Sequence, residues 1–174
     1  MRVGNDIVDL GDPAIARLHP RFIERVCVDD EQRSISESCD PKRRLWTLFA
    51  AKEAAYKAAV KLGLDPGFAH RRFVASSNLD RVDFGEHTFA LRVIDGEDWV
   101  HAIVGDATIA GVEQGESARE PLLRALGMMH LAIEREPRVG SWDGFGPPRV
   151  MGAPNVDVSL SHDGRFAAFA AGVP

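Results

Sequence analysis

The stretch from residue 46 to residue 57 constrains the fold of this chain more than any other segment. It reads WTLFAAKEAAYK, contains neither Gly nor Pro, and consists mostly of strong helix formers. Small and apolar side chains recur at three- and four-residue spacing from Leu48 to Leu62, which predicts a helix with one face suited to close packing. We expect this helix to cover about residues 42–62, with Gly63 as its C-cap.

The segments before this helix predict one strand and several short helices. Residues 2–10 are rich in β-forming side chains and predict a strand. Pro13 and Pro20 each stand where a helix can begin. The acids of residues 29–31 predict the start of a further short helix, which we expect to end near Ser38.

Beyond residue 70 the sequence changes to the apolar–polar alternation that is typical of strands. A hairpin is predicted over residues 88–105 because Asp95-Gly96 is a favourable turn pair, and another strand is expected over residues 107–113. Ser117 is a suitable cap for a helix that we expect to reach Glu136, with leucines and Met129 facing a core.

The C-terminal part of the chain predicts a loop followed by short strands. Residues 137–148 are rich in Gly and Pro and predict the loop. Strands are expected over residues 149–151 and 156–160, and Asp163-Gly164 predicts a turn between the last two strands. The whole pattern predicts an α+β fold, in which an antiparallel sheet has the long helix packed across it.

The composition limits the classes of protein to consider. A chain of 174 residues can form one domain over 1–174, and residues 114–148 are the best candidate for an insertion or a joint between subdomains. A net charge of −5 argues against general nucleic-acid binding, and no apolar run approaches the ~20 residues that span a bilayer. Acids stand where a signal peptide has its apolar core, and Cys27 and Cys39 form no disulfide framework, so we expect a cytoplasmic protein.

Several polar side chains occupy positions that allow two interpretations. Asp6 and Asp9 fall in an apolar strand, where a carboxylate must be paired, hydrogen-bonded or bound to a metal unless the strand end is exposed. Glu53 and Lys57 are four residues apart on one helix face, and an ordinary solvated ion pair is the simplest interpretation.

A second polar pair and a group of basic residues also allow two interpretations. Ser161 and His162 precede a tight turn, where they can meet a ligand or simply lie on the surface. Arg17, Arg21 and Arg25 indicate either a solvated helix face or a surface for an anionic ligand or acidic partner.

Three motifs, taken together, resemble a known family. They are GNDIVD at residues 4–9, WxxxAAKEAxxK at 46–57 and SLSHDG at 159–164. In this order they resemble the 4'-phosphopantetheinyl transferase superfamily, and the order is similar to that of holo-acyl-carrier-protein synthases. The resemblance covers residues 2–63 and about 144–172. It implies transfer of the phosphopantetheine arm of coenzyme A to a serine of an acyl or peptidyl carrier protein, with release of 3',5'-ADP.

The resemblance also implies roles for single residues. Asp6 and Glu53 are expected to hold Mg²⁺, with Mn²⁺ as an alternative, because the metal must offset the charge of the substrate phosphates. Lys57 is expected to contact the phosphates and to share in catalysis with Glu53. Ser161 and His162 are expected to hold the pyrophosphate or the 3'-phosphate of coenzyme A.

The resemblance also suggests a general base, and the chain departs from the family pattern at two positions. Glu31 is expected to be the base, with a metal-bound water as the rival. Val8 stands where the larger surfactin-synthetase-type enzymes have a second acid, so two protein carboxylates are expected at the metal. Asp9 matches an acid common in the small synthases. Pro147 replaces a lysine of the family, and Arg149 is either its substitute or unrelated to it.

The resemblance leads to expectations about partners and assembly. Carrier proteins are acidic around the modified serine, so Arg17, Arg21 and Arg25 are expected to form the docking surface. Since the chain has one copy of each motif, we expect a homo-oligomer, with a trimer favoured and sites between subunits. The alternative is that the middle segment completes the site within one chain.

Two other functions fit the same residues. The first is a Mg²⁺-dependent phosphohydrolase that uses the same acids, and the second is a non-catalytic module that binds a carrier protein or coenzyme A. The sequence does not indicate which carrier protein is used.

Overall fold

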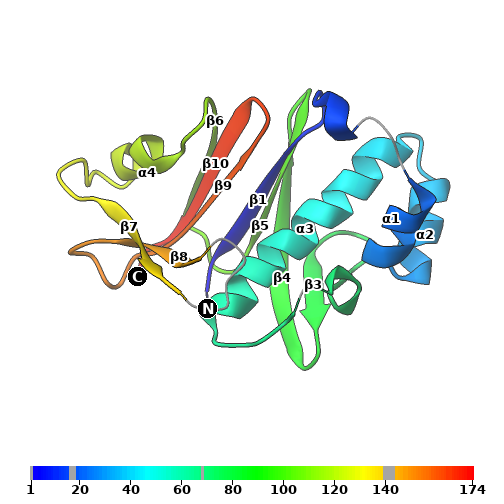
Figure 1. The fold of residues 1–174 in the computed structure, drawn as a ribbon, viewed down its shortest axis with the longest axis horizontal. Coiled ribbons are helices and arrows are strands. Elements are labelled where there is room, and N and C mark those ends of the chain that lie inside the picture. The colour runs from blue at the N-terminus through cyan, green and yellow to red at the C-terminus, as the bar shows by residue number, and fades with distance from the viewer. Residues whose placement is uncertain (1, 16–18, 68, 139–143) are drawn as a thin grey trace.

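A computed structural model describes residues 2–15, 19–67, 69–138 and 144–174 (Figure 1). Its described part forms two antiparallel five-stranded sheets. The first sheet has the order β1-β5-β4-β3-β2, formed by Gly4–Asp9, Trp99–Val104, His87–Asp95, Arg81–Phe84 and Val74–Ala75. The second has the order β6-β10-β9-β8-β7, formed by Ile109–Gln114, Phe166–Gly172, Asp157–Asp163, Phe145–Val150 and Ile133–Pro137.

The helices lie mainly in the first part of the chain. They are α1 (Pro20–Val26), α2 (Asp29–Ser36), α3 (Pro41–Lys61) and α4 (Arg119–Ala125), with short 3-10 turns η1 (Pro13–Ile15) and η2 (His70–Arg72). Among the described residues, none of these helices is long and apolar enough to cross a membrane. The α+β class and the long helix across an antiparallel sheet are therefore confirmed.

The ends of α3 follow from local chemistry. Asp40 caps the N-terminus by accepting a hydrogen bond from the backbone N–H of Arg43 at 2.9 Å, and Pro41 occupies the first helical position. Leu62 is the C-cap, and Gly63 follows it with a φ of +79°, which only glycine adopts without strain. The predicted helix is thus correct to within one residue at each end.

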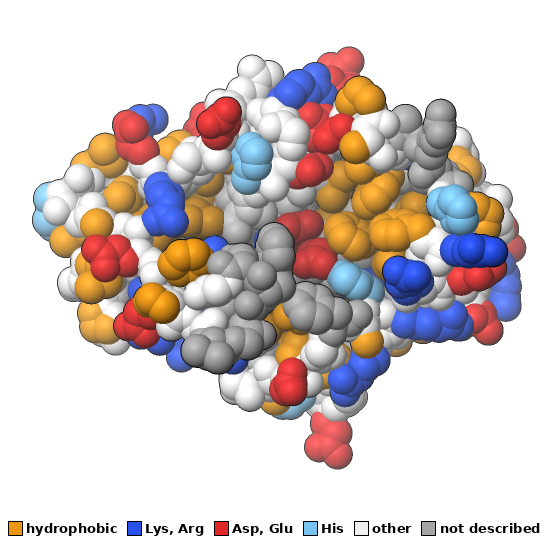
Figure 2. Space-filling view, viewed as in Figure 1, with side chains coloured by type: hydrophobic (Ala, Val, Ile, Leu, Met, Phe, Trp, Pro, Cys, Tyr) orange, Lys and Arg blue, Asp and Glu red, His pale blue; other side chains and the backbone are white. Residues whose placement is uncertain are grey.

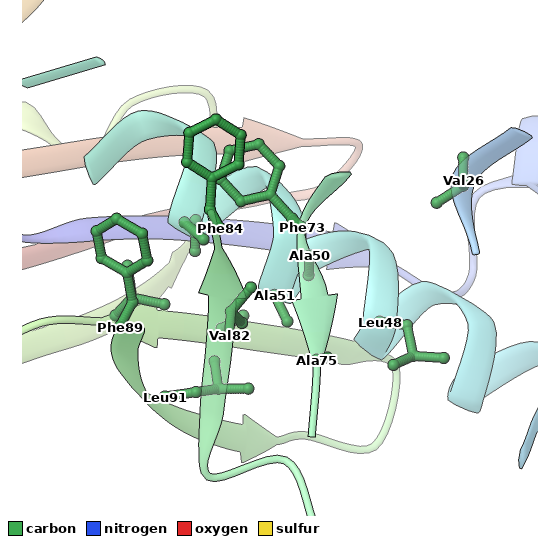
Figure 3. Close-up of a cluster of buried hydrophobic side chains, with 14 of the residues drawn as sticks. Val26, Leu48, Ala50, Ala51, Phe73, Ala75, Val82, Phe84, Phe89 and Leu91 are labelled. Atoms are coloured by element: carbon green, nitrogen blue, oxygen red, sulfur yellow. The ribbon is translucent and has the colours of Figure 1, made fainter. Parts of the chain in front are cut away.

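Small residues let α3 lie close to the first sheet. Ala54, Ala55 and Ala58 are fully buried on the face that contacts β1. A Cβ at Gly4 would lie only 2.0 Å from the carbonyl oxygen of Ala54, so β1 can approach α3 because residue 4 has no side chain. Toward the N-terminus of α3, buried aromatic and aliphatic side chains fill the space between the helix and β2 to β4 (Figure 3).

Strand β9 of the second sheet lies beside β1 of the first sheet (Figure 1). Side chains of β9 accept hydrogen bonds from backbone N–H groups of β1 and of Val3 just before it. The distances are 2.6 to 3.0 Å, and the partners are always 154 residues apart along the chain, in the pairs Val3–Asp157, Asn5–Ser159 and Asp9–Asp163. The constant offset means that the two strands run in the same direction. The last motif of the sequence is thereby placed alongside the first.

Asp9 ties this junction together. Both of its carboxylate oxygens accept hydrogen bonds from the guanidinium of Arg165, at 2.7 and 2.8 Å. These bonds hold the pKa of the buried Asp9 carboxyl well below its usual range. Asp9 therefore has a structural role in the fold, joining β1 to the turn between β9 and β10.

The segment after Ser117 differs from its prediction. The helix begins at Arg119 and ends at Ala125, and Gly127 follows with a φ of +68°. The residues expected to continue the helix instead form turns up to residue 132 and then β7, which pairs with β8 from Ile133 onward. Met129, predicted to face a core, is 51% exposed. Part of the predicted loop belongs to β8, and residues 139–143 lie outside the described residues.

Candidate functional site

A cavity of about 390 Å³ lies between the C-terminal half of α3 and the second sheet. Its wall on the α3 side includes Glu53 and Lys57, and its wall on the β9 side includes Ser161 and His162. The remaining wall comes from β7, β8 and the residues that lead into α4. On the face shown in Figure 2, acidic side chains gather near the centre and hydrophobic side chains lie beside them.

Asp6 and Lys57 connect the first strand to this cavity. Lys57 donates hydrogen bonds from Nζ to Asp6 Oδ1 at 2.8 Å and to the carbonyl oxygen of Asn5 at 2.9 Å. Burial raises the pKa of Asp6 to about 6, Lys57 opposes this shift, and the negative charge of Glu53 adds to it. The structure therefore brings Asp6, Glu53 and Lys57 together from a strand and a helix.

Glu53 has a partner that no motif indicated. Its Oε1 is hydrogen-bonded to Nε2 of His70, and the His70 ring is stacked on Phe49 with centroids 5.2 Å apart and planes 22° apart. His70 lies in η2, beyond the end of α3, so its contact with Glu53 depends on how the chain returns toward the helix. Nothing in the local sequence distinguishes this histidine from a surface residue.

Ser161 is positioned by a buried asparagine. Asn5 Nδ2 lies 3.1 Å from Ser161 Oγ and 3.0 Å from Nε2 of His101. Because the amide donates to Ser161 Oγ, the hydroxyl hydrogen of Ser161 is available to a ligand in the cavity. His162 is exposed on the same wall.

The free energy of unfolding is expected to fall in acid because of His101. Burial lowers the pKa of this ring to about 3, whereas an unfolded histidine titrates near 6.5. The contribution of neutral His101 to the free energy of unfolding is thus fully present above pH 6.5. It declines between pH 6.5 and 3, by about 1.4 kcal/mol per pH unit. Urea unfolding at pH 7, 5.5 and 4.5 should show a shallower decline for His101→Gln, and an equal decline would contradict the assignment. His87→Gln, at an exposed histidine, is the control.

A group of arginines lines the cavity opposite α3. Arg119, Arg135 and Arg138 come from the region whose role the sequence left open. Arg135 donates from Nε to the carbonyl oxygen of Gly146 at 2.7 Å, which holds its guanidinium along β8. With Lys57 and Lys61 on the other wall, the cavity is basic on two sides although the chain is acidic overall. We call Arg119, Arg135 and Arg138 the arginine wall.

Pro147 and Arg149, the two residues that the sequence compared with a lysine of the resembled family, lie in different places. Pro147 lines the cavity. Arg149 does not line it, and its guanidinium instead pairs with Glu136 at 3.1 Å. The arginine wall, and not Arg149, therefore supplies positive charge on this side.

Glu31, the expected general base, does not line this cavity. It is 4% exposed, and its Oε2 accepts hydrogen bonds from Lys52 Nζ at 2.7 Å and from the N–H of Val28 at 2.9 Å. Its Oε1 accepts from the N–H of Ala75 at 2.9 Å. A carboxylate with both oxygens occupied by buried donors, outside the cavity wall, is placed to hold structure and not to accept a proton from a substrate.

Arg21 and Arg25, two of the predicted docking residues, do not line this cavity. Arg21 and Arg25 are exposed on α1, and Arg17 lies outside the described residues. Next to them, Phe22, Trp46 and Phe49 pack ring against ring with centroids 5.4 to 5.8 Å apart. We call these three rings the aromatic cluster, and its Phe49 is the ring that stacks on His70.

Asp6 and Glu53 fit a magnesium site that has only two protein carboxylates. The described residues contain no cluster of three or more His, Cys, Asp or Glu side chains that could hold a metal alone. Mg²⁺ is, however, usually held by one or two protein carboxylates together with substrate phosphates. The negative charge of Glu53 raises the pKa of Asp6, and a bound cation would relieve this repulsion. Asp6 and Glu53 thus suit a metal that arrives with a phosphate ligand.

Comparison with known proteins gives one family match. The model of a family described as the 4'-phosphopantetheinyl transferase superfamily matches residues 2–104. No curated protein matches the chain. The matched region contains the first two of the three motifs, and the third lies in the part of the chain beyond it.

Two solved structures are similar to this chain. The holo-[acyl-carrier-protein] synthase from Neisseria meningitidis is 24% identical, with 59% of this chain and 94% of that chain covered and a TM-score of 0.48. The holo-[acyl-carrier-protein] synthase from Thermotoga maritima is 18% identical, with 88% and 87% covered and a TM-score of 0.41. Both TM-scores lie below 0.5, so the family match carries the assignment.

Proposed function

Because the chain belongs to the 4'-phosphopantetheinyl transferase superfamily, we propose that it transfers the phosphopantetheine arm of coenzyme A to a serine of an acyl or peptidyl carrier protein. The observation that supports this most is the convergence of Glu53, Lys57, Ser161 and His162 on one cavity, with Asp6 joined to Lys57 behind it. These are residues of all three motifs, brought together from a strand, a helix and the last hairpin.

In the proposed reaction, the carrier serine oxygen attacks the phosphorus atom that bears the pantetheine arm. The bond from this phosphorus to the bridging oxygen of the pyrophosphate breaks, 3',5'-ADP leaves with the electron pair, and the proton of the serine hydroxyl passes to water. A bound Mg²⁺, or Mn²⁺, held by Asp6 and Glu53 would offset the phosphate charge. Lys57 adds a fixed positive charge at the same wall, and Ser161 and His162 offer hydrogen-bond donors to phosphate oxygens.

Coenzyme A carries phosphate groups at two places, which suits a cavity that is basic on two sides. Arg138→Ala, in the arginine wall, is therefore expected to raise the KM for coenzyme A about tenfold with little change in kcat, because a charge-assisted contact made in both ground and transition states is lost. Steady-state kinetics and calorimetric titration with coenzyme A measure this. Arg149→Ala, outside the cavity, is the matched control, and equal effects of the two changes would contradict the assignment.

We propose that the site is completed within one chain. Both walls of the cavity come from the same polypeptide, with residues 114–148 supplying part of the second wall. This supports the alternative in which the middle segment completes the site within one chain. A homotrimer stays a prediction that a single chain does not test.

Activity per chain is accordingly expected to be independent of enzyme concentration down to the nanomolar range. Transfer rates measured over a dilution series, with light scattering at the upper concentrations, check this. Loss of specific activity on dilution would show that a second subunit contributes to the site.

The carrier protein is proposed to dock on the face formed by α1 and the aromatic cluster. Arg21 and Arg25 provide positive charge for an acidic carrier, and the aromatic cluster provides apolar area beside them. The cluster ends at Phe49, which contacts His70 and so reaches the edge of the catalytic site. A carrier bound there would present its serine near Glu53.

The rival functions are separated by their products. The purified protein is incubated with coenzyme A, Mg²⁺ and a panel of apo carrier proteins, and released nucleotide is followed by chromatography. Release of 3',5'-ADP that requires a carrier supports the proposal. Free phosphate from nucleotides without a carrier would instead indicate a phosphohydrolase, and binding of coenzyme A with no release would indicate a non-catalytic module.

A further inference from the structure

We infer that His70 is a positioning residue, which orients the Glu53 carboxylate toward the divalent cation that the proposed function requires. The inference rests on that function and adds a residue from outside the three motifs. It starts from one contact, the hydrogen bond between Nε2 of His70 and Oε1 of Glu53.

The direction of this hydrogen bond follows from the chemistry of its partners. An ionised carboxylate can only accept, so Nε2 of His70 must carry the hydrogen. Among the described residues, no hydrogen bond reaches the other oxygen of Glu53, Oε2. The histidine therefore engages one oxygen and leaves the second for another ligand.

The His70 ring is itself held in place from two directions. One face is stacked on Phe49, with centroids 5.2 Å apart. The backbone carbonyl oxygen of His70 accepts a hydrogen bond from Lys52 Nζ at 3.4 Å, and Lys52 also donates to the carbonyl oxygen of Phe73 at 2.5 Å. Since Lys52 is fully buried and paired with Glu31, it fixes η2 against α3.

The neighbours of His70 anchor η2 further. Arg71 donates to the carbonyl oxygen of Glu24 in α1 at 2.9 Å and to Asp29 at 2.6 Å at the start of α2. Arg72 donates to the carbonyl oxygen of Pro66 at 2.9 Å. Side chains of three successive residues thus hold this short turn, and the turn presents the imidazole to Glu53 from a fixed backbone.

A fixed donor matters here because Glu53 has a long side chain that is only partly buried. Its carboxylate is 25% exposed and is repelled by the nearby Asp6, so without a partner it would sample orientations that point away from Asp6. Hydrogen bonds that orient a ligating carboxylate are worth about 10–100-fold in metal affinity. His70 supplies such a bond and would keep Glu53 near Asp6 before the metal arrives.

The test measures metal binding directly. Mn²⁺ is titrated into the full chain in the presence of coenzyme A and without a carrier protein, and free Mn²⁺ is followed by electron paramagnetic resonance. His70→Phe keeps a ring for the stack on Phe49 and removes the N–H donor, so its Mn²⁺ dissociation constant is expected to rise about 10–100-fold. His70→Gln keeps an N–H donor of similar reach and is expected to recover most of this loss.

Two controls separate positioning from a purely structural role. Thermal melting of each variant is compared with that of the wild type, and His87→Ala removes an exposed histidine at the start of β4, away from the cavity. Unchanged Mn²⁺ affinity in His70→Phe, or an equal loss in His70→Gln and His70→Phe, would overturn the inference. If the wild type itself binds no Mn²⁺ with coenzyme A, the metal site of the proposed function fails instead.

Discussion

Glu53→Gln is expected to reduce the rate of phosphopantetheine transfer at least about a thousandfold, because it removes one of two proposed metal carboxylates. Stabilisation of phosphoryl charge by a metal is worth several kcal/mol, and each 1.36 kcal/mol changes a rate about tenfold. The fold is expected to survive, since Glu53 is only half-buried and its charge repels Asp6. Single-turnover transfer and thermal melting measure the two effects. The same outcome is expected for Glu53→Ala.

A matched control is available on another element. Glu134→Gln changes the same chemical group at an exposed position of β7, and it should leave the rate unchanged. Full transfer activity in Glu53→Gln would remove Glu53 from the site and, with it, the proposed magnesium pair.

Glu31→Ala is expected to lower the free energy of unfolding by about 3–5 kcal/mol, since it leaves the fully buried ammonium of Lys52 without its counter-charge. This is a large part of the ~5–15 kcal/mol by which proteins are stable. Urea unfolding monitored by circular dichroism gives the value. Removing both charges, in Glu31→Gln with Lys52→Met, is expected to recover most of the loss because no buried charge remains unpaired.

The transfer activity of Glu31 variants decides whether Glu31 acts as a structural partner of Lys52 or as the general base. Asp30→Ala, which removes an exposed acid 3.4 Å from Arg33, should change stability by less than about 1 kcal/mol and serves as the control. The expected result for Glu31→Gln, which keeps the contact of Lys52 with η2, is substantial transfer activity at temperatures where it is folded. A stable Glu31→Ala protein that has lost transfer would restore Glu31 as the base and contradict its structural assignment.

Local signals in the sequence were sufficient for the long helix and for the hairpins. The ends of α3 could be predicted because Asp40-Pro41 and Gly63 act on their immediate neighbours. The helix expected to extend from Ser117 to Glu136 was wrong for the opposite reason. Its second half pairs with β8, and such a contact depends on a distant strand and not on helix propensity.

The residues of the candidate site also fall into those that a local motif predicts and those that only the folded chain reveals. Asp6, Glu53 and His162 could be proposed because each lies in a short motif, although the sequence does not contain the parallel alignment of β1 and β9 that brings the first and last motifs together. His70 and the arginine wall could not be proposed, since their relevance comes only from contacts made in the folded chain. The burial of Glu31 against Lys52 could not be predicted either, because the two residues are 21 positions apart and meet only in the folded chain.

The most direct test of the proposed function is the intact mass of an apo carrier protein after incubation with coenzyme A, Mg²⁺ and this protein. The expected result is a gain of one phosphopantetheine arm on the carrier, which disappears when a chelator replaces Mg²⁺ and when Glu53→Gln replaces the wild type. A panel of fatty-acid, polyketide and peptide carriers that all keep their apo mass with the folded wild-type protein would contradict it.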